Sequence, residues 1–287
     1  MMKDSRQRGL IEWRKQVISH HKQSIAAQNN YDSKQDFWRG ETDRFRDDPF
    51  RINDSVLNKL VTEFNDCDTV LDVGGGAGRF ALPLARSRSK ITVVDSSESM
   101  LEQLRADSTY FDITNVDSLL SRWEDTDIGP HSGVLCSHVT YGIEDIVRFV
   151  NNLTTHADKR VLILTFMDSP QSHLGHIWEI IHEEQRIHLP GAPELMNVLW
   201  DLGLTPELEV IETLSPHIYQ NLELTISDLR RRLYISEGGE KDHRFISNIN
   251  NQLEKVADGI GLKYSSERTL CLIKWETAPT NPRRITN

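Results

Sequence analysis

Short apolar runs alternate with segments of helical hydrophobic spacing along most of this chain. Four runs are predicted strands, at residues 70–73, 90–95, 133–139 and 159–166. Alternating strands and helices form a parallel sheet with right-handed crossovers and helices on both faces. One more strand belongs between the second and third runs, where residues 110–114 compete with a run ending near Ser121. The predicted fold class is therefore α/β, with a doubly wound and mostly parallel sheet.

Residues 1–52 precede this unit and are predicted to form an N-terminal appendage. Residues 5–28 place Leu10, Trp13, Val17, His21 and Ile25 at helical spacing, which predicts an amphipathic helix. That helix is expected to cap the active site, pack on the sheet or make a dimer contact. Residues 31–50 mix aromatic and charged side chains, which favours a lid over a bound ligand or a segment anchored to the core.

The C-terminal half is predicted to add helical insertions to a domain of residues 53–277. The insertions are expected at about 170–190 and 225–260, the second with helices at 225–234 and 241–259. Further helices are expected at 54–64 and 192–203, and further strands at 208–214 and 269–276. Residues 278–287 are predicted to form a tail.

Composition narrows the function classes. A chain of 287 residues with 38% hydrophobic content suits one large domain with appendages. The net charge of -10 argues against a general basic surface for nucleic acid. Three scattered cysteines predict reduced thiols rather than a disulfide framework. Neither a signal peptide nor a membrane span is apparent, so the sequence predicts a cytoplasmic protein without a membrane partner. The acidic net charge predicts that nucleic acid is not a partner either.

The glycine-rich stretch after the first strand carries the main chemical signal. Glycines at this point allow a tight turn and let the backbone approach a ligand closely. The pattern Asp72-x-Gly74-x-Gly76-x-Gly78 resembles motif I of the class I S-adenosylmethionine-dependent methyltransferases. The same stretch also fits a dinucleotide fingerprint, Gly76-x-Gly78-x-x-Ala81, so a nicotinamide-dependent oxidoreductase is a second interpretation. A third is a related protein that binds S-adenosylmethionine without catalysis.

The ends of the later strands extend the resemblance to a Rossmann-like methyltransferase fold. Asp95 ends the second strand about 17 residues after Gly78, near the ~20 expected for an acid that binds ribose hydroxyls. Asp95-Ser96-Ser97-x-x-Met100-Leu101 resembles motif II, and Arg122 occupies the place where many family members carry an acid. The resemblance implies that the cofactor is S-adenosylmethionine, bound by Asp72, Gly74, Gly75, Gly76, Gly78, Asp95, Ser96, Met100, Trp123, Glu124 and Cys136.

Candidate catalytic residues follow the fourth strand. His138 is the first candidate for a general base, and Tyr141 is the second, because a protonated nucleophile must lose its proton during methyl transfer. Methyltransferases that act on nucleic-acid bases usually carry Asn/Asp-Pro-Pro-aromatic here, whereas this chain has Cys136-Ser137-His138-Val139. The resemblance therefore implies a small-molecule acceptor, methylated at oxygen or nitrogen.

Two further groups are candidates for the acceptor side. Trp38, Arg44 and Phe45 belong to the predicted lid segment. His176 and Glu179 share one face of the predicted helix at 172–185, where they line a substrate pocket or face solvent. A metal site on this face is less favoured than either interpretation, so no metal is predicted. The sequence also allows a homodimer.

Overall fold

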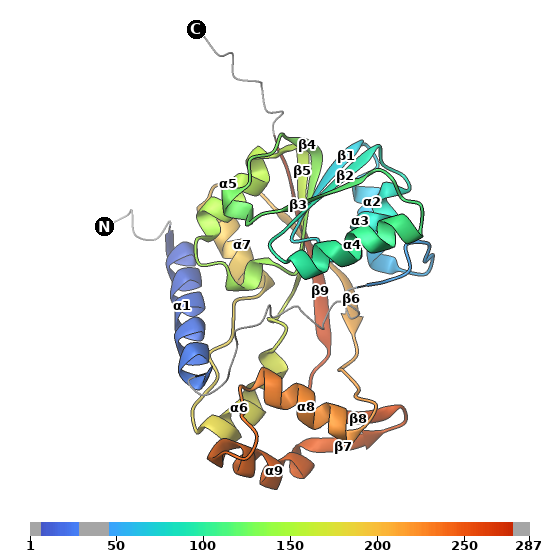
Figure 1. Cartoon of the computed structure of the whole chain (residues 1–287). Coiled ribbons are helices and arrows are strands. Elements are labelled where there is room, and N and C mark those ends of the chain that lie inside the picture. The colour runs from blue at the N-terminus through green and yellow to red at the C-terminus, as the bar shows by residue number, and fades with distance from the viewer. Residues whose placement is uncertain (1–6, 29–45, 278–287) are drawn as a thin grey trace, which may run out of the picture.

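A seven-stranded sheet in the order β3-β2-β1-β4-β5-β9-β6 is the centre of the molecule (Figure 1). The computed structural model describes residues 7–28 and 46–277. The strands of the sheet are β1 (Thr69–Val73), β2 (Lys90–Asp95), β3 (Val116–Leu120), β4 (His131–Ser137), β5 (Ala157–Phe166), β6 (Glu207–Leu214) and β9 (Arg268–Glu276). Strands β1 to β5 pair in parallel, while β9 pairs antiparallel with β5 and β6. The predicted doubly wound, mostly parallel fold is confirmed.

Helices cover both faces of this sheet (Figure 1). One face is covered by α2 (Ser55–Glu63), α3 (Ala81–Ala85) and α4 (Glu98–Tyr110), and the other by α1 (Arg8–Gln28), α5 (Ile146–Thr155) and α7 (Ala192–Asp201). Successive strand residues point to opposite faces, so Val70 packs in one core and Leu71 in the other. Two apolar cores therefore hold the strand ends in fixed positions.

The third strand is formed by the later of the two competing runs. Residues 110–114 are not a strand, because α4 continues through Tyr110 and ends at Phe111. Asp112 then adopts a left-handed backbone with φ 54°. Such a residue terminates a helix and reverses the chain, so the next extended run, β3, pairs with β2.

A second lobe lies below the sheet in Figure 1. It contains α6 (Gly175–His182), α8 (Leu222–Arg232), α9 (Glu240–Gln252), β7 (Leu253–Val256) and β8 (Gly259–Leu262). Trp178, Leu229 and Phe245 belong to its shared core. The expected helix at 241–259 is too long, because residues 253–262 form the β7–β8 hairpin. The turn consists of Ala257 and Asp258, and Gly259, at φ 149°, begins β8.

Helix α1 makes its main helix contacts with α7 and α5. Its inward residues are Trp13, Val17, His20 and Ser24, whereas Ile25 is 62% exposed. The predicted stripe through His21 and Ile25 is therefore wrong for the last turns. There the helix faces the polar backbone of residues 185–189, and His20 Nδ1 donates to the Ile187 carbonyl at 2.6 Å. The predicted lid residues Trp38, Arg44 and Phe45 lie outside the described residues.

The buried His20 makes this contact sensitive to acid. Burial, followed by the charge of Arg186, lowers the pKa of His20 to about 4. Arg186 Nη2 donates to His20 Nε2 at 3.1 Å, so the imidazole is neutral here. Because the pKa is lower in the folded than in the unfolded state, stability falls as pH drops from 6.5 toward 4.

A His20→Gln variant is expected to lose less stability in acid. Glutamine can accept from Arg186 and donate to Ile187 without titrating. At pH 4.5 the loss of free energy of unfolding should be about 1–2 kcal/mol smaller in the variant than in the wild type, after allowing for solvent screening. Denaturant titrations at pH 7.5 and 4.5 measure it, with the exposed His243→Gln as the control. Equal acid sensitivity of the wild type and His20→Gln would contradict the assignment.

Candidate active site

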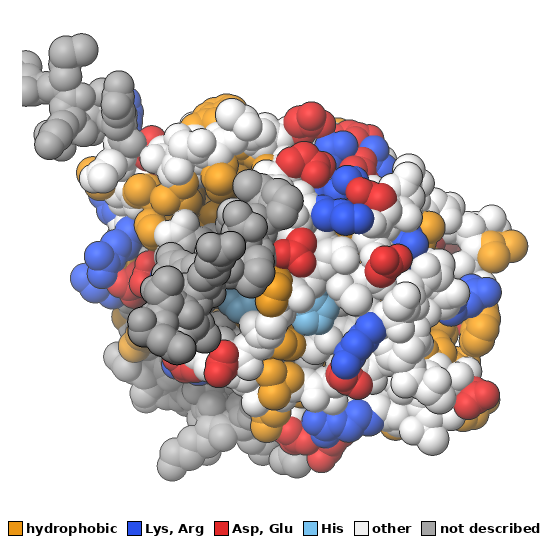
Figure 2. Space-filling view, turned by 90° about the horizontal axis from the view of Figure 1, so that it is seen from above, with side chains coloured by type: hydrophobic (Ala, Val, Ile, Leu, Met, Phe, Trp, Pro, Cys, Tyr) orange, Lys and Arg blue, Asp and Glu red, His pale blue; other side chains and the backbone are white. Residues whose placement is uncertain are grey.

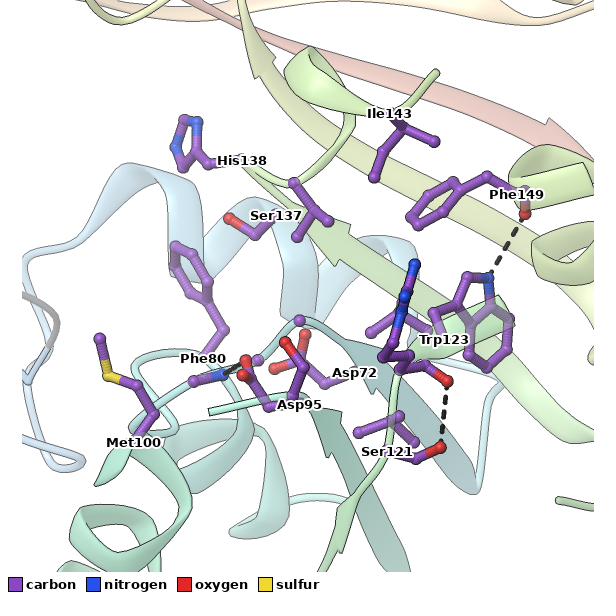
Figure 3. Close-up of a pocket in the computed structure, with 18 of the residues that line it drawn as sticks. Asp72, Phe80, Asp95, Met100, Ser121, Trp123, Ser137, His138, Ile143 and Phe149 are labelled. Atoms are coloured by element: carbon purple, nitrogen blue, oxygen red, sulfur yellow. Dashed lines mark hydrogen bonds between the residues drawn. The ribbon is translucent and has the colours of Figure 1, made fainter. Parts of the chain in front are cut away.

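A cavity of about 440 Å³ lies at the carboxyl ends of β1, β2 and β4 (Figure 3). It lies where parallel α/β sheets bind their ligands. The residues that line it are Asp72, Val73, Gly74, Gly75, Gly76, Arg79, Phe80, Val94, Asp95, Ser96, Met100, Ser121, Arg122, Trp123, Glu124, Ser137, His138, Val139, Ile143 and Phe149. Nine of the eleven predicted cofactor residues are among them, together with the candidate base His138.

The glycine-rich turn fits closely against its neighbours. Gly74, Gly76 and Gly78 have positive φ angles of 70°, 53° and 85°, which side chains disfavour. A Cβ atom on Gly74 would lie 2.3 Å from Val139 Cγ2. On Gly78 it would lie 2.4 Å from Leu104 Cδ1, so Gly78 is needed for packing against α4 and does not line the cavity.

Asp95 links the glycine-rich turn to the start of α4. Its Oδ2 accepts from the Gly76 N–H at 2.9 Å, and its Oδ1 accepts from the Ser97 N–H at 2.8 Å. A carboxylate offers about four lone-pair positions, so it can accept further hydrogen bonds from a ligand. The hydroxyl pair of a ribose matches this capacity.

Asp72 is the most strongly perturbed acid of the site. It is 1% exposed, and its Oδ1 has no hydrogen-bond partner among the described residues. Burial, followed by the charge of Asp95, raises the pKa of Asp72 to about 7. Figure 3 shows the two carboxylates side by side in the middle of the cavity. An orphaned buried carboxylate oxygen fits a ligand with a positively charged group, such as the ammonium of a methionine moiety.

The side of the cavity opposite Met100 is built around Trp123 (Figure 3). The Trp123 Nε1–H donates to the Phe149 carbonyl at 3.4 Å, and its ring meets His156 edge-on at 5.1 Å. These contacts fix the indole in the core while part of it faces the cavity. Glu124 lies next to it, 3.8 Å from the guanidinium of Arg122. Aromatic and acidic side chains thus line one side of the space in which an adenine could bind, and the Met100 thioether lies on the opposite side.

His138 stands at the mouth of the cavity in a left-handed backbone conformation with φ 58°. Its Nδ1 lies 3.0 Å from Tyr141 Oη, which accepts from the Phe166 N–H at 2.8 Å. Partial removal from water, followed by the charges of Arg79 and Arg268, lowers the pKa of His138. Because the imidazole is exposed, water moderates this shift. A neutral imidazole at the mouth is available to accept a proton.

Several predicted residues lie away from the cavity lining. Tyr141 is buried beneath His138, burial raises its pKa to about 12, and its hydroxyl lies 3.0 Å from His138 Nδ1. Cys136 is fully buried in the core. His176 and Glu179 are exposed in the second lobe, where the ring of His176 contacts Tyr264 at 4.6 Å. In the described part of the chain, no three His, Cys, Asp or Glu side chains come together to hold a metal ion.

Several cavity residues were missed by sequence reasoning. Arg79 and Phe80 directly follow the glycine-rich turn, so their proximity to the motif was an available signal. Ile143 and Phe149 reach the cavity through the packing of α5 and the loop before it. Trp13 Nε1 on α1 donates to the Ile143 carbonyl at 2.8 Å and thereby supports this wall.

The comparisons with known proteins concern the family of the chain and its fold. Residues 43–209, more than half of the chain, match a family model described as a methyltransferase domain. An uncharacterized protein of Haemophilus influenzae is 28% identical over 58% of this chain and 60% of its own length. A ubiquinone biosynthesis O-methyltransferase of Rickettsia felis is 30% identical over 39% of this chain and 46% of its own length. The chain thus spans roughly half the length of these relatives.

A solved structure extends the likeness over most of the fold. Magnesium protoporphyrin IX methyltransferase from Synechocystis PCC 6803, with bound S-adenosylhomocysteine, superposes with a TM-score of 0.50 and 14% sequence identity. The match covers 92% of this chain and 99% of that chain. At this identity the likeness concerns the fold alone. The described segments contain no helix that is both long and apolar enough to cross a membrane.

Proposed function

This chain belongs to the methyltransferase domain family, and from that premise we propose that it transfers the methyl group of S-adenosylmethionine to oxygen or nitrogen of a small-molecule acceptor. The observation that carries the proposal is the cavity with Asp95 at the end of β2 and Asp72 near the end of β1. One carboxylate oxygen of Asp72 has no partner among the residues that the structure describes. A nicotinamide enzyme would have a use for Asp95 but none for a buried carboxyl group at Asp72.

We assign the cofactor contacts residue by residue. Asp95 binds the ribose hydroxyls, and Asp72 binds the methionine ammonium directly or through a water molecule. Met100, Trp123 and Glu124 surround the adenine. When bound, S-adenosylmethionine supplies an electrophilic methyl group on its sulfonium sulfur.

The chain's own residues align the acceptor and remove its proton. Methyl transfer needs an in-line nucleophile and exclusion of water more than it needs covalent chemistry from the protein. Val139, Ile143 and Phe149 give the cavity its apolar wall. His138 accepts the proton of the nucleophile, and Tyr141 fixes the position of its imidazole.

Surface charge supports a small acceptor rather than a nucleic acid. On the face shown in Figure 2, acidic and basic side chains are interspersed, unlike a nucleic-acid binding surface. The Rickettsia relative is named as an O-methyltransferase of ubiquinone biosynthesis, which supports transfer to oxygen. The predicted homodimer and cytoplasmic location stay predictions.

Calorimetric titration separates the competing functions. We expect the protein to bind S-adenosylmethionine and S-adenosylhomocysteine but neither NAD(H) nor NADP(H). Tight nicotinamide binding without S-adenosylhomocysteine binding would overturn the proposal. Methyl transfer to some member of a panel of hydroxyl and amine compounds separates an enzyme from a non-catalytic binding protein.

The ribose assignment predicts the effect of Asp95→Ala. Loss of the ribose hydrogen bonds is expected to weaken S-adenosylhomocysteine binding by about 1–3 kcal/mol. Asp117→Ala, which removes an exposed acid on the neighbouring strand β3, is the matched control. Equal calorimetric affinities for wild type and Asp95→Ala would show that another acid binds the ribose.

A further inference from the structure

Three side chains form a row that leads away from the cavity along one edge of the sheet. The imidazole of His138, at the cavity mouth, stacks on the ring of Phe166 with centroids 4.7 Å apart. The guanidinium of Arg268 lies 5.1 Å from the centroid of the same ring. Phe166 ends β5 and Arg268 begins the antiparallel β9, so the neighbouring strands bring them to the same edge. The row therefore joins the proposed proton acceptor to an arginine outside the cofactor cavity.

Other titratable side chains near this row respond to positive charge. Arg268 lowers the pKa values of both His138 and His173. Arg232 lowers the pKa of His173 as well, so two guanidiniums act on this histidine. The net charge of -10 gives the chain a negative electrostatic potential on average. Arginines that lie together create a positive potential locally, and this attracts anions.

We infer from this row that the methyl acceptor is an anionic small molecule whose carboxylate or phosphate group is bound by Arg268 beside His138. The inference rests on the proposed methyl transfer. A guanidinium has five N–H donors, so it can bind a carboxylate or phosphate through two parallel hydrogen bonds and still keep other contacts. An anion held there places the rest of the acceptor next to the imidazole of His138.

Calorimetry with three probes tests this inference. Benzoate, phenyl phosphate and benzamide share one ring and differ in charge. Each is titrated into protein saturated with S-adenosylhomocysteine, for the wild type, Arg268→Gln and Arg268→Lys. Arg86→Gln is the matched control, because Arg86 also lies over a phenylalanine, 4.6 Å from the Phe50 centroid, but away from the cavity lining.

The wild type is expected to bind at least one anionic probe about tenfold or more tightly than benzamide. Arg268→Gln should abolish this preference, Arg268→Lys should retain part of it, and Arg86→Gln should leave it unchanged. The ranking of benzoate against phenyl phosphate identifies the preferred anion. Equal binding of all three probes, or binding of neither anion, overturns the inference.

The design separates this inference from the proposed function. Binding of S-adenosylhomocysteine is measured first on every variant. A wild type that does not bind it contradicts the proposed methyl transfer, whereas a wild type that binds it without preferring anions contradicts only the inference. If Arg268→Gln does not fold, the inference is tested by the wild-type preference for anions and by the partial preference expected in Arg268→Lys.

Discussion

An Asp72→Asn variant is expected to bind S-adenosylmethionine about 30-fold or more weakly, because removing one partner of a buried charge pair costs about 2–5 kcal/mol. The carboxylate of Asp72 is 1% exposed, and its Oδ1 has no partner among the described residues. A bound ammonium would provide that partner. Asparagine has nearly the same shape, so the loss would report on charge rather than on packing.

The same variant is expected to be more stable than the wild type when no ligand is bound. The pKa of Asp72 is about 7 in the folded protein, above its usual 3.8. The folded state therefore retains a proton that the unfolded state releases, and stability falls as pH rises through this window. Asparagine avoids this loss, so the free energy of unfolding should increase by about 1–3 kcal/mol at pH 8 and by less at pH 4, after the cost of burying its amide.

Proton linkage gives the sharpest measurement. Below pH 7, a cationic ligand must displace the proton of Asp72, so wild-type affinity should rise with pH between about 5.5 and 7, by up to tenfold per unit. Calorimetry in buffers of different ionisation enthalpy should detect the released proton, and Asp72→Asn should release none. The exposed Asp117→Asn is the control. A wild-type affinity independent of pH, or an unchanged affinity in Asp72→Asn, would exclude a direct role for this carboxylate.

The parts of the site that the sequence predicts well are those encoded next to strand ends. Asp72, the glycines and Asp95 lie within a few residues of β1 or β2, so local pattern places them at the carboxyl edge. Cys136 lies equally close to that edge but faces elsewhere. Its side chain lies in the core beneath α5 and α7, whereas Ser137, the next residue of β4, lines the cavity. Strand alternation, rather than distance along the chain, decides between these two residues.

Long-range packing explains most of what the sequence does not predict. The inward face of α1 depends on the loop at residues 185–189. The Ile187 carbonyl of this loop accepts from His20, and its Arg186 guanidinium donates to Ser24. No local hydrophobic pattern encodes such partners. The row from His138 through Phe166 to Arg268 likewise joins three strands, and β9 reaches it from the far end of the chain. The acceptor side is therefore assembled from residues that are distant in sequence, while the cofactor side is largely local.

A His138→Asn variant is expected to lower kcat about 100-fold while leaving S-adenosylhomocysteine affinity within about twofold, since general base catalysis contributes about 10²–10⁴-fold. Asparagine suits this test because it tolerates the left-handed backbone at φ 58° and cannot take up a proton near neutral pH. The pKa of His138 lies below its usual value, so the wild-type rate should fall only in acid, below about pH 6.

The pH profile separates proton removal from alignment. If His138 removes a proton, the acid limb of kcat/KM should follow the imidazole pKa measured by NMR and should vanish in His138→Asn. Tyr141→Phe, which removes the hydroxyl next to Nδ1, should retain the limb with a smaller loss of rate, because Tyr141 only positions the ring. A His138→Asn variant with nearly wild-type kcat would mean that this site methylates an already deprotonated nucleophile. Catalysis would then depend on alignment by the cavity and, for an anionic acceptor, on Arg268.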